Sequence, residues 1–143
     1  MKKKNHKYWA FFISILAAII FNSCREEIIS PENNSGNVNE PYKTNYWNSY
    51  TFILNSENLS QNVIDYPRIS YINSRIFVSV LNHTSGSVEI VILTKSREVL
   101  YRKRLEEDNN GSYGILEGIK PEIIEIYLNE FTGKLKFQLT GVL

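Results

Sequence analysis

Strict alternation of apolar and polar residues near the C-terminus is the pattern that most constrains the fold. Residues 134–139 read Lys-Leu-Lys-Phe-Gln-Leu, with every second residue apolar. Successive side chains of a β-strand point to opposite faces, whereas an amphipathic helix repeats its apolar residues every three or four positions. The segment is therefore predicted to be a strand with one face on the core and the other in solvent.

A β-hairpin is predicted at the centre of the fold. Residues 88–94 and 99–105 are rich in Val, Ile, Leu and Tyr, and they are separated by the polar segment 95–98. Branched and aromatic side chains favour strands, and a short polar segment between two such runs is typical of a hairpin. The segment 108–111, Asp-Asn-Asn-Gly, is a strong turn signal after the second arm.

Other apolar and aromatic stretches predict the remaining strands, with polar connections between them. The predicted connections are 55–62, 82–86 and 129–133, and the further strands are 46–54, 68–72, 76–81, 113–116 and 123–128. This makes seven or eight short strands with frequent turn signals and no convincing amphipathic helix. The fold class predicted is all-β, an antiparallel immunoglobulin-like β-sandwich. A membrane β-barrel is disfavoured because its strands run about 9–11 residues.

The sandwich segment resembles a group of known proteins. The hairpin sequence SVEIVILTKSREVLY (87–101) and the sequence EIIEIYLNEFTGKLKFQL (122–139) are similar to small immunoglobulin-like exported proteins, most of them of unknown function. The resemblance implies the fold and implies no activity.

The N-terminus has the pattern of an export signal. Lysines at positions 2, 3, 4 and 7 precede an uncharged, mostly apolar run of 14 residues, 8–21. A spanning helix needs about 18 or more apolar residues, and a secretory signal peptide needs a basic head and a shorter apolar run. Residues 1–23 are therefore predicted to be a signal peptide.

The end of the apolar run resembles a bacterial lipobox. Residues 21–24 read Phe-Asn-Ser-Cys, and Cys24 is the only cysteine of the 143 residues. The resemblance implies cleavage before Cys24 and attachment of lipid to Cys24. The lipid would hold the protein at a membrane. The alternative is an ordinary signal peptide or uncleaved anchor with an incidental cysteine. A single cysteine also excludes an intramolecular disulfide.

The three residues after the cysteine bear on location. Arg25, Glu26 and Glu27 are similar to the short export signal of surface-exposed lipoproteins in some Gram-negative groups. The resemblance implies a lipid-anchored protein of the outer membrane, on its outer face, with the periplasmic face as the alternative. A solvated, charged start of a linker is the other interpretation of the same residues.

Composition separates a tether from a domain. Residues 24–41 are polar, with Asn, Ser, Gly and two prolines, and they predict a flexible tether between the lipidated cysteine and a β-sandwich domain at 42–143. The signal carries 4 of the 16 basic residues and none of the 15 acidic ones, so the mature chain has a formal charge of 12 − 15 = −3. Nucleic acid is therefore not expected as a partner.

The chemical inventory for catalysis is small. After removal of the signal only His83 remains among the histidines, in a polar segment where a surface turn is the simpler interpretation. A zinc site needs three or four Cys, His or carboxylate ligands, and no phosphate-binding glycine loop is present. No catalytic residue, metal site or cofactor is expected. A small hydrolase that uses His83 as a base is the enzymatic alternative.

An aromatic cluster supplies the candidate ligand-binding residues. Five aromatic residues lie within 42–52, and alternation places Tyr50 and Phe52 on the same face, in the core. Trp47 lies on the opposite face, and Tyr42 lies near the tether. Exposed aromatic rings bind sugars and proteins, so Tyr42 and Trp47 are the predicted ligand-binding residues.

These features favour a non-enzymatic module. A lipid anchor, a tether and a sandwich without catalytic groups predict a protein that binds a protein or glycan ligand at the cell envelope, or serves as an accessory subunit there. The alternative is an immunity or inhibitor lipoprotein that protects the envelope from a secreted hydrolase or toxin.

Overall fold

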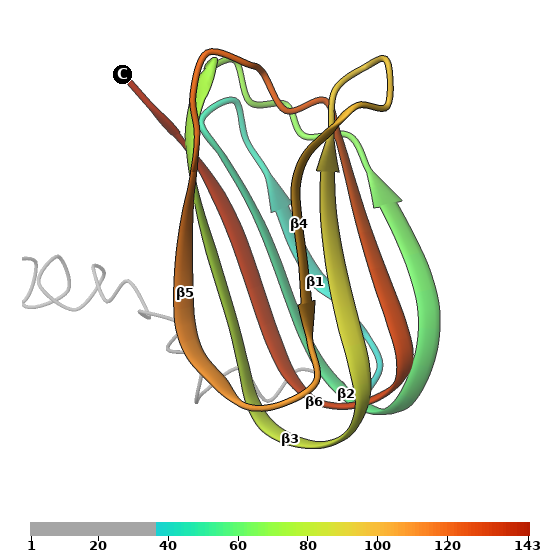
Figure 1. Cartoon of the computed structure of the whole chain (residues 1–143). Helices are drawn as coiled ribbons and strands as arrows, with labels where there is room; N and C mark the ends of the chain where they lie inside the picture. Colours follow the sequence, from blue (N-terminus) through green and yellow to red (C-terminus); the bar gives the residue numbers. More distant parts are fainter. Residues whose placement is uncertain (1–36) are drawn as a thin grey trace, which may run out of the picture. The chain divides into compact units, whose positions relative to one another are not determined.

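Six antiparallel strands make up the domain. The structure is a computed structural model in which residues 37–143 are described (Figure 1). The strands are β1 (Tyr42–Asn45), β2 (Ser49–Asp65), β3 (Asn73–Leu93), β4 (Val99–Leu105), β5 (Asn109–Leu116) and β6 (Ile123–Val142).

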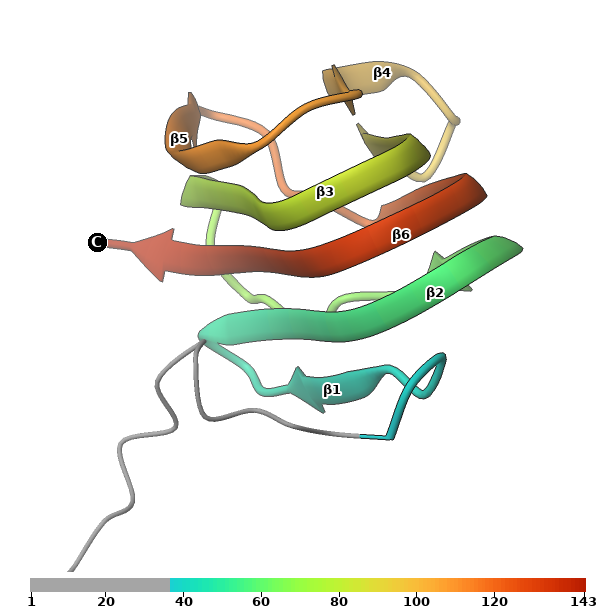
Figure 2. The same ribbon diagram turned by 90° about the horizontal axis from the view of Figure 1, so that it is seen from below.

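One sheet folds over to form both layers of the sandwich. The strand order is β1-β2-β6-β3-β4, and β5 pairs with β3. The three long strands β2, β3 and β6 lie side by side and curve together (Figures 1 and 2). The first half of β3 pairs with β5, and its second half pairs with β4. Layer 1 therefore holds β1, β5, the first halves of β2 and β3 and the second half of β6. Layer 2 holds β4, the second halves of β2 and β3 and the first half of β6.

Irregular backbone at one level produces the bend. The pairing of β2 with β6 shifts register between Ser56 and Gln61, and that of β3 with β6 shifts between Leu81 and Ser87. Extra residues in one strand bend it and increase its twist. Positive φ angles occur at the same level, at Asn58, Asn82, Gly86, Glu130 and Gly133.

Polar side chains join the three bends. The Ser85 hydroxyl donates to Thr132 Oγ1 over 3.1 Å, and the backbone N–H of Asn58 donates to the same oxygen over 2.8 Å. The backbone N–H of Glu130 donates to Ser60 Oγ over 2.9 Å. These bonds satisfy backbone and hydroxyl groups that the disrupted ladder leaves free. They hold β2, β3 and β6 at a common bend.

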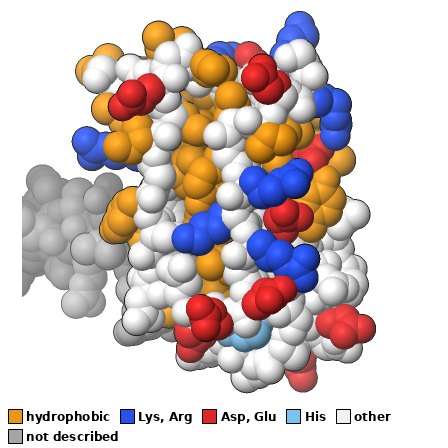
Figure 3. All heavy atoms as spheres, in the orientation of Figure 1, with side chains coloured by type: hydrophobic (Ala, Val, Ile, Leu, Met, Phe, Trp, Pro, Cys, Tyr) orange, Lys and Arg blue, Asp and Glu red, His pale blue; other side chains and the backbone are white. Residues whose placement is uncertain are grey.

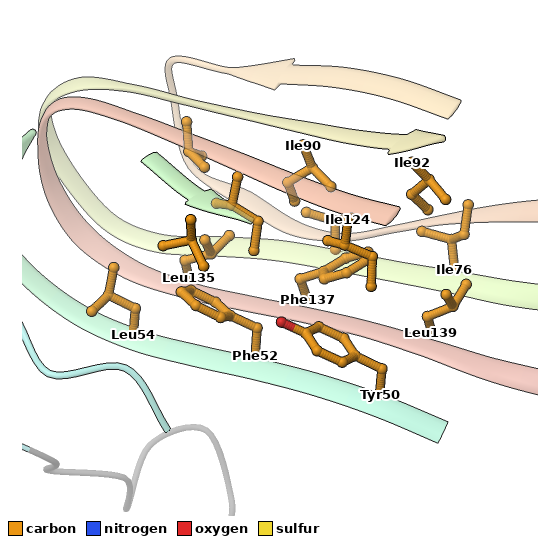
Figure 4. Close-up of a cluster of buried hydrophobic side chains, with 14 of the residues drawn as sticks. Tyr50, Phe52, Leu54, Ile76, Ile90, Ile92, Ile124, Leu135, Phe137 and Leu139 are labelled. Carbon is orange, nitrogen blue, oxygen red and sulfur yellow. The ribbon is translucent and has the colours of Figure 1, made fainter. Parts of the chain in front are cut away.

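The core lies between the two layers. Figure 4 shows Tyr50, Phe52 and Leu54 of β2 in the cluster together with side chains of β3 and β6. Their alternation with partly exposed residues follows the pleat of each strand. The buried set includes Ile76, Val78, Val80, Val88, Ile90, Ile92, Ile124, Ile126, Leu135, Phe137 and Leu139.

The open end and the open edge of the sandwich are closed by single residues. Between β2 and β3, Ile69 is fully buried and joins the core cluster, and Tyr71 packs against it. At the edge, Tyr101 of β4 approaches Gly114 of β5 so closely that a Cβ there would lie 3.2 Å from its ring. The gap between the two edge strands is thus filled by an aromatic ring.

The predicted class is confirmed, and the predicted number of strands is wrong. The domain is an antiparallel β-sandwich with six strands rather than seven or eight. The segments 55–62, 82–86 and 129–133 lie within β2, β3 and β6, because backbone pairing continues through the bend where side chains meet solvent. The segment 68–72 forms no strand. The hairpin is confirmed, since β3 ends at Leu93 and β4 begins at Val99.

Part of the predicted tether contacts the sandwich. The backbone N–H of Asn39 donates to Asn55 O over 2.8 Å, and its side-chain amide donates to Glu57 O over 3.1 Å. The Glu57 N–H donates back to Asn39 Oδ1 over 2.9 Å. Asn39 is therefore fixed to β2, ahead of the predicted domain boundary at residue 42.

The bend predicts which glycine the fold needs most. A Cβ at Gly86 would lie 2.3 Å from the carbonyl oxygens of Asn129 and Glu130, at a φ of +75°. We expect Gly86→Ala to lower the free energy of unfolding by more than about 2 kcal/mol, measured by urea titration of the full chain. Gly118 is the matched control, because it has a φ of +73° and no atom within 4 Å of its ideal Cβ. An equal loss in Gly118→Ala would contradict the role given to the bend.

Candidate functional site

The predicted lipidation and export residues cannot be placed. Cys24, Arg25, Glu26 and Glu27 lie outside the described residues, so the anchor stays a prediction. Within residues 37–143, no helix has the length and apolar character that crossing a membrane requires.

The predicted aromatic cluster divides between core and surface. Tyr50 and Phe52 are buried, as predicted, whereas Tyr42 and Trp47 are 46% and 62% exposed. Tyr42 pairs with Ile53 in β1, and Trp47 lies in the turn beyond the other end of that strand. Trp47 stacks on Tyr71, with ring centroids 5.7 Å apart and an interplanar angle of 26°. Tyr42 and Trp47 therefore do not form one surface, and one side of Trp47 is used in covering the end of the sandwich.

Another aromatic pair lies on the outer face of layer 1. Phe77 of β3 pairs in register with Tyr113 of β5 and with Gln138 of β6. Because neighbouring residues in a strand point to opposite sides, burial of Ile76 and Val78 in the core turns Phe77 outward. Tyr113 is 81% exposed and Ile115 is 67% exposed.

The two rings are held in a fixed relation. The centroids of Phe77 and Tyr113 are 5.2 Å apart with an interplanar angle of 56°, and Lys136 Nζ lies 5.6 Å from the Phe77 centroid. Such distances suit aromatic contact and cation–π attraction. A Cβ at Gly111 would lie only 2.9 Å from the Phe77 ring, so this glycine leaves the space that the ring occupies.

An open hollow surrounds the rings. Its volume is about 390 Å³, and its lining includes Arg75, Phe77, Tyr113, Lys136, Gln138 and Thr140. We call the surface formed by Arg75, Phe77, Tyr113, Ile115, Lys136 and Gln138 the Phe77–Tyr113 face. It combines two rings with amide, hydroxyl, ammonium and guanidinium groups.

The charges on this side of the sandwich have one sign. Among residues 37–143, no outward-pointing strand position of layer 1 is Asp or Glu, and no carboxylate lies within 4.0 Å of Arg75, Lys134 or Lys136. Layer 2 differs, because Glu89 pairs with Arg102 at 3.5 Å on its outer side. Layer 1 therefore presents cations on its outer side without carboxylates among the described residues.

A second charged cluster, on layer 2, has a structural role. Glu125 is 4% exposed, and it accepts hydrogen bonds from Arg97 Nη2 at 2.6 Å and from the Tyr127 hydroxyl at 2.5 Å. The bond to this carboxylate, with some burial, raises the pKa of Tyr127. Val91, Leu93 and Ile123 form the apolar cluster against which Tyr127 packs. The Arg97–Glu125 pair thus joins the β3–β4 turn to β6.

A third cluster bridges the two ends of β2. The Tyr50 hydroxyl donates to Asp65 Oδ2 over 2.6 Å, and Lys43 Nζ lies 3.0 Å from the same oxygen. Burial, and then the hydrogen bond to the Asp65 carboxylate, raise the pKa of Tyr50 well above its ordinary value of 10.0. Tyr50 lies near the start of β2 in layer 1 and Asp65 ends this strand in layer 2, so the contact helps to close the open end of the sandwich.

His83 lies in the bend of β3. Its Nε2 is 3.0 Å from Gly86 O, and its ring centroid is 5.9 Å from that of Phe131. The neighbouring Ser85 Oγ lies 3.2 Å from Glu130 O and 3.1 Å from Thr132 Oγ1. The described residues therefore do not combine His83 with a serine as base and nucleophile. They also contain no group of three or more His, Cys, Asp or Glu side chains placed to hold a metal ion.

Comparison with known proteins adds two distant structural likenesses. No protein-family model and no curated protein matches the sequence. A chain from Bacillus endospore appendages, described as a novel family of disulfide-linked pili, is 11% identical with a TM-score of 0.45, covering 71% of this chain and 91% of that one. The unliganded BiXyn10A CBM1 is 8% identical with a TM-score of 0.38, covering 72% and 90%. Both likenesses are too distant to transfer a function.

The Phe77–Tyr113 face is not evident from the sequence, because apolar residues occupy both faces of the predicted strand 76–81, a pattern typical of a strand that is covered on both sides. Ser79 is indeed buried, but Phe77 is partly exposed. The signal was present in β5, where Gly111, Tyr113 and Ile115 alternate with residues that point inward. Two exposed apolar residues at alternate positions of an edge strand, next to a third on the neighbouring strand, form a candidate interaction surface.

The Tyr50–Asp65 contact predicts how stability responds to alkaline pH. The raised pKa keeps the folded state protonated where the unfolded chain already loses its proton, so the stabilisation is complete below pH 10 and declines above it. We expect Tyr50→Phe to lower the free energy of unfolding by about 1 kcal/mol at pH 7. Above pH 10 the free energy of unfolding of the native chain should decline by up to about 1.4 kcal/mol per pH unit through Tyr50, and Tyr50→Phe should lack this decline.

Urea titrations at pH 7, 9, 10 and 11 would measure both effects. Tyr66→Phe is the matched control, because Tyr66 is exposed and follows Asp65 directly. If Tyr50→Phe and the native chain lose stability at the same rate above pH 10, Tyr50 is not the titrating group.

Proposed function

We propose that this protein is a non-enzymatic, lipid-anchored binding module of the outer membrane, and that it binds its ligand on the Phe77–Tyr113 face. The observation that carries the proposal is an aromatic pair, with Tyr113 exposed and Phe77 partly exposed, next to cations that have no carboxylate partner among residues 37–143. Nothing in the packing of the sandwich requires this combination.

The energetics of exposed rings support a binding role. Tyr113 and Ile115 leave much apolar surface in water, and burying such surface contributes about 25 cal/mol per Å². Aromatic residues supply large contact areas at low conformational entropy, because they have only two side-chain torsions. A ligand bound on this face gains free energy from burial of apolar surface and loses little conformational entropy in the aromatic side chains.

The predicted anchor supports presentation of the face at the cell surface. Lipid on Cys24 holds the chain at the membrane, and Arg25, Glu26 and Glu27 direct it to the outer face in this proposal. Among residues 37–143, Asn39 makes the first hydrogen bonds to β2.

Photo-crosslinking in intact cells tests the ligand face. We expect p-benzoylphenylalanine in place of Tyr113 to form a covalent adduct, detected as a shifted band or smear on a blot. The same amino acid in place of Tyr66, another exposed tyrosine, is the matched control. Replacement of Trp47 tests the surface predicted from the sequence.

Adducts at position 113 and their absence at position 66 agree with the proposal. Adducts at 47 alone would move the ligand to the end of the sandwich. Failure of position 113 to crosslink in cells that display the protein would refute the proposed face.

The anchor has its own test. We expect Cys24→Ala to abolish incorporation of a labelled fatty acid and to leave the signal peptide uncleaved, because lipid attachment precedes cleavage in bacterial lipoproteins. Ser30→Ala, which lies outside the lipobox, is the control that keeps the cysteine and the cleavage motif. Labelled fatty acid in the Cys24→Ala chain would show that the anchor is elsewhere.

A further inference from the structure

We infer that the Phe77–Tyr113 face binds an acidic polysaccharide, with sugar rings on the aromatic side chains and carboxylate or sulfate groups on Arg75 and Lys136. This inference rests on the proposed function and names the chemical class of its ligand. Three features of the face carry it: the sign of its charges, the form of its apolar surface and the polar groups around the hollow.

The charge of the domain is segregated. Although the mature chain is net acidic, the outward strand positions of layer 1 carry cations and, within residues 37–143, no carboxylate. Acidic side chains lie instead at the two ends of the sandwich, as Figure 3 shows. Glu57, Glu130 and the 106–108 segment lie at the bent end, and Glu98 and Glu122 lie at the other end. Such a separation attracts an anionic ligand to the outer side of layer 1 and repels it from the two ends of the sandwich.

The exposed apolar surface of the Phe77–Tyr113 face is small, which suits stacking of a sugar ring better than a protein interface. Its exposed members are Tyr113, Ile115 and part of Phe77. A stable protein interface buries about 800 Å² on each partner around a larger apolar centre. The hollow of about 390 Å³ lies within the range of about 300–1,000 Å³ for small-ligand sites.

The polar groups at the hollow suit a sugar. Gln138 and Thr140 provide donors and acceptors for hydroxyl groups. Arg75 offers a planar guanidinium that can hold a carboxylate or sulfate through two parallel hydrogen bonds. Lys136 is placed over Phe77, so its ammonium group and an aromatic ring meet the ligand together.

Binding of defined polysaccharides to the full chain in detergent tests this inference. The probes are polygalacturonate with its neutral methyl ester, and dextran sulfate with neutral dextran, immobilised for biolayer interferometry. We expect at least one acidic probe to bind about tenfold or more tightly than its neutral counterpart, and to weaken as salt is added.

Substitutions identify the face. Tyr113→Ala, and Arg75→Gln combined with Lys136→Gln, should each weaken binding of the acidic probe about fivefold or more. The matched controls are Tyr66→Ala, an exposed tyrosine outside the face, and Arg102→Gln, a cation of layer 2. Both should stay within about twofold of the native chain. The mutated residues of the face are surface residues, and circular dichroism would verify that each variant is folded.

Four outcomes overturn the inference: no binding of either acidic probe, equal binding of a neutral counterpart, equal binding of polyglutamate or single-stranded DNA, or insensitivity to the substitutions. Polyglutamate and DNA separate sugar recognition from general attraction of polyanions. A protein adduct at position 113 in cells, with no acidic probe bound, would leave the proposed binding role intact and refute the polysaccharide. No adduct and no probe bound would refute both.

Discussion

The shared bend of β2, β3 and β6 is the constraint on which the rest of the structure depends. β6 pairs with β2 and β3 through both layers, so the position of the bend sets how the two arms of the sheet face each other. Gly86 allows the closest approach there, because the backbone of β6 occupies the space of any Cβ. The inward rows of side chains meet as a core only when all three strands turn at one level. The Phe77–Tyr113 face depends on the same bend, since Phe77 and Lys136 lie on the outside of the arm that the bend creates.

Much of the fold could be predicted from side-chain patterns, and the bend could not. Alternation at 134–139 and the paired arms around 95–98 identified strands correctly, because those residues have one buried and one exposed side. Periodicity reports where side chains point and not whether the backbone is paired. At the bend, polar residues such as Asn58 and Asn82 face solvent while the ladder resumes beyond them, so the segments resemble loops. The opposite error occurred at 68–72. Ile69 is buried although its backbone is not paired in a sheet, and a buried apolar residue in such a segment resembles part of a strand.

The candidate site was harder to predict because its residues meet only through strand register. Tyr42 and Trp47 were chosen because aromatic residues are dense near them in the sequence, but neighbours in sequence diverge at a turn. Phe77 and Tyr113 lie far apart in sequence and become adjacent through the pairing of β3 with β5. The cationic residues of the face are likewise distant in sequence and brought together by strand pairing. Arg75 and Lys136 belong to different strands, and only the folded sheet shows that no described carboxylate shares their side.

Comparison of the two outer faces shows why stability alone does not account for layer 1. Layer 2 places Arg97 and Tyr127 on the Glu125 carboxylate, so its buried charge is neutralised within the fold. Layer 1 holds Arg75, Lys134 and Lys136 on one side without a described counter-charge, and like charges on a common face repel each other. The exposed Tyr113 ring adds a second unfavourable term, because its apolar surface stays in water. An anionic ligand with an apolar ring face relieves both terms at once, whereas a neutral ligand relieves only the second.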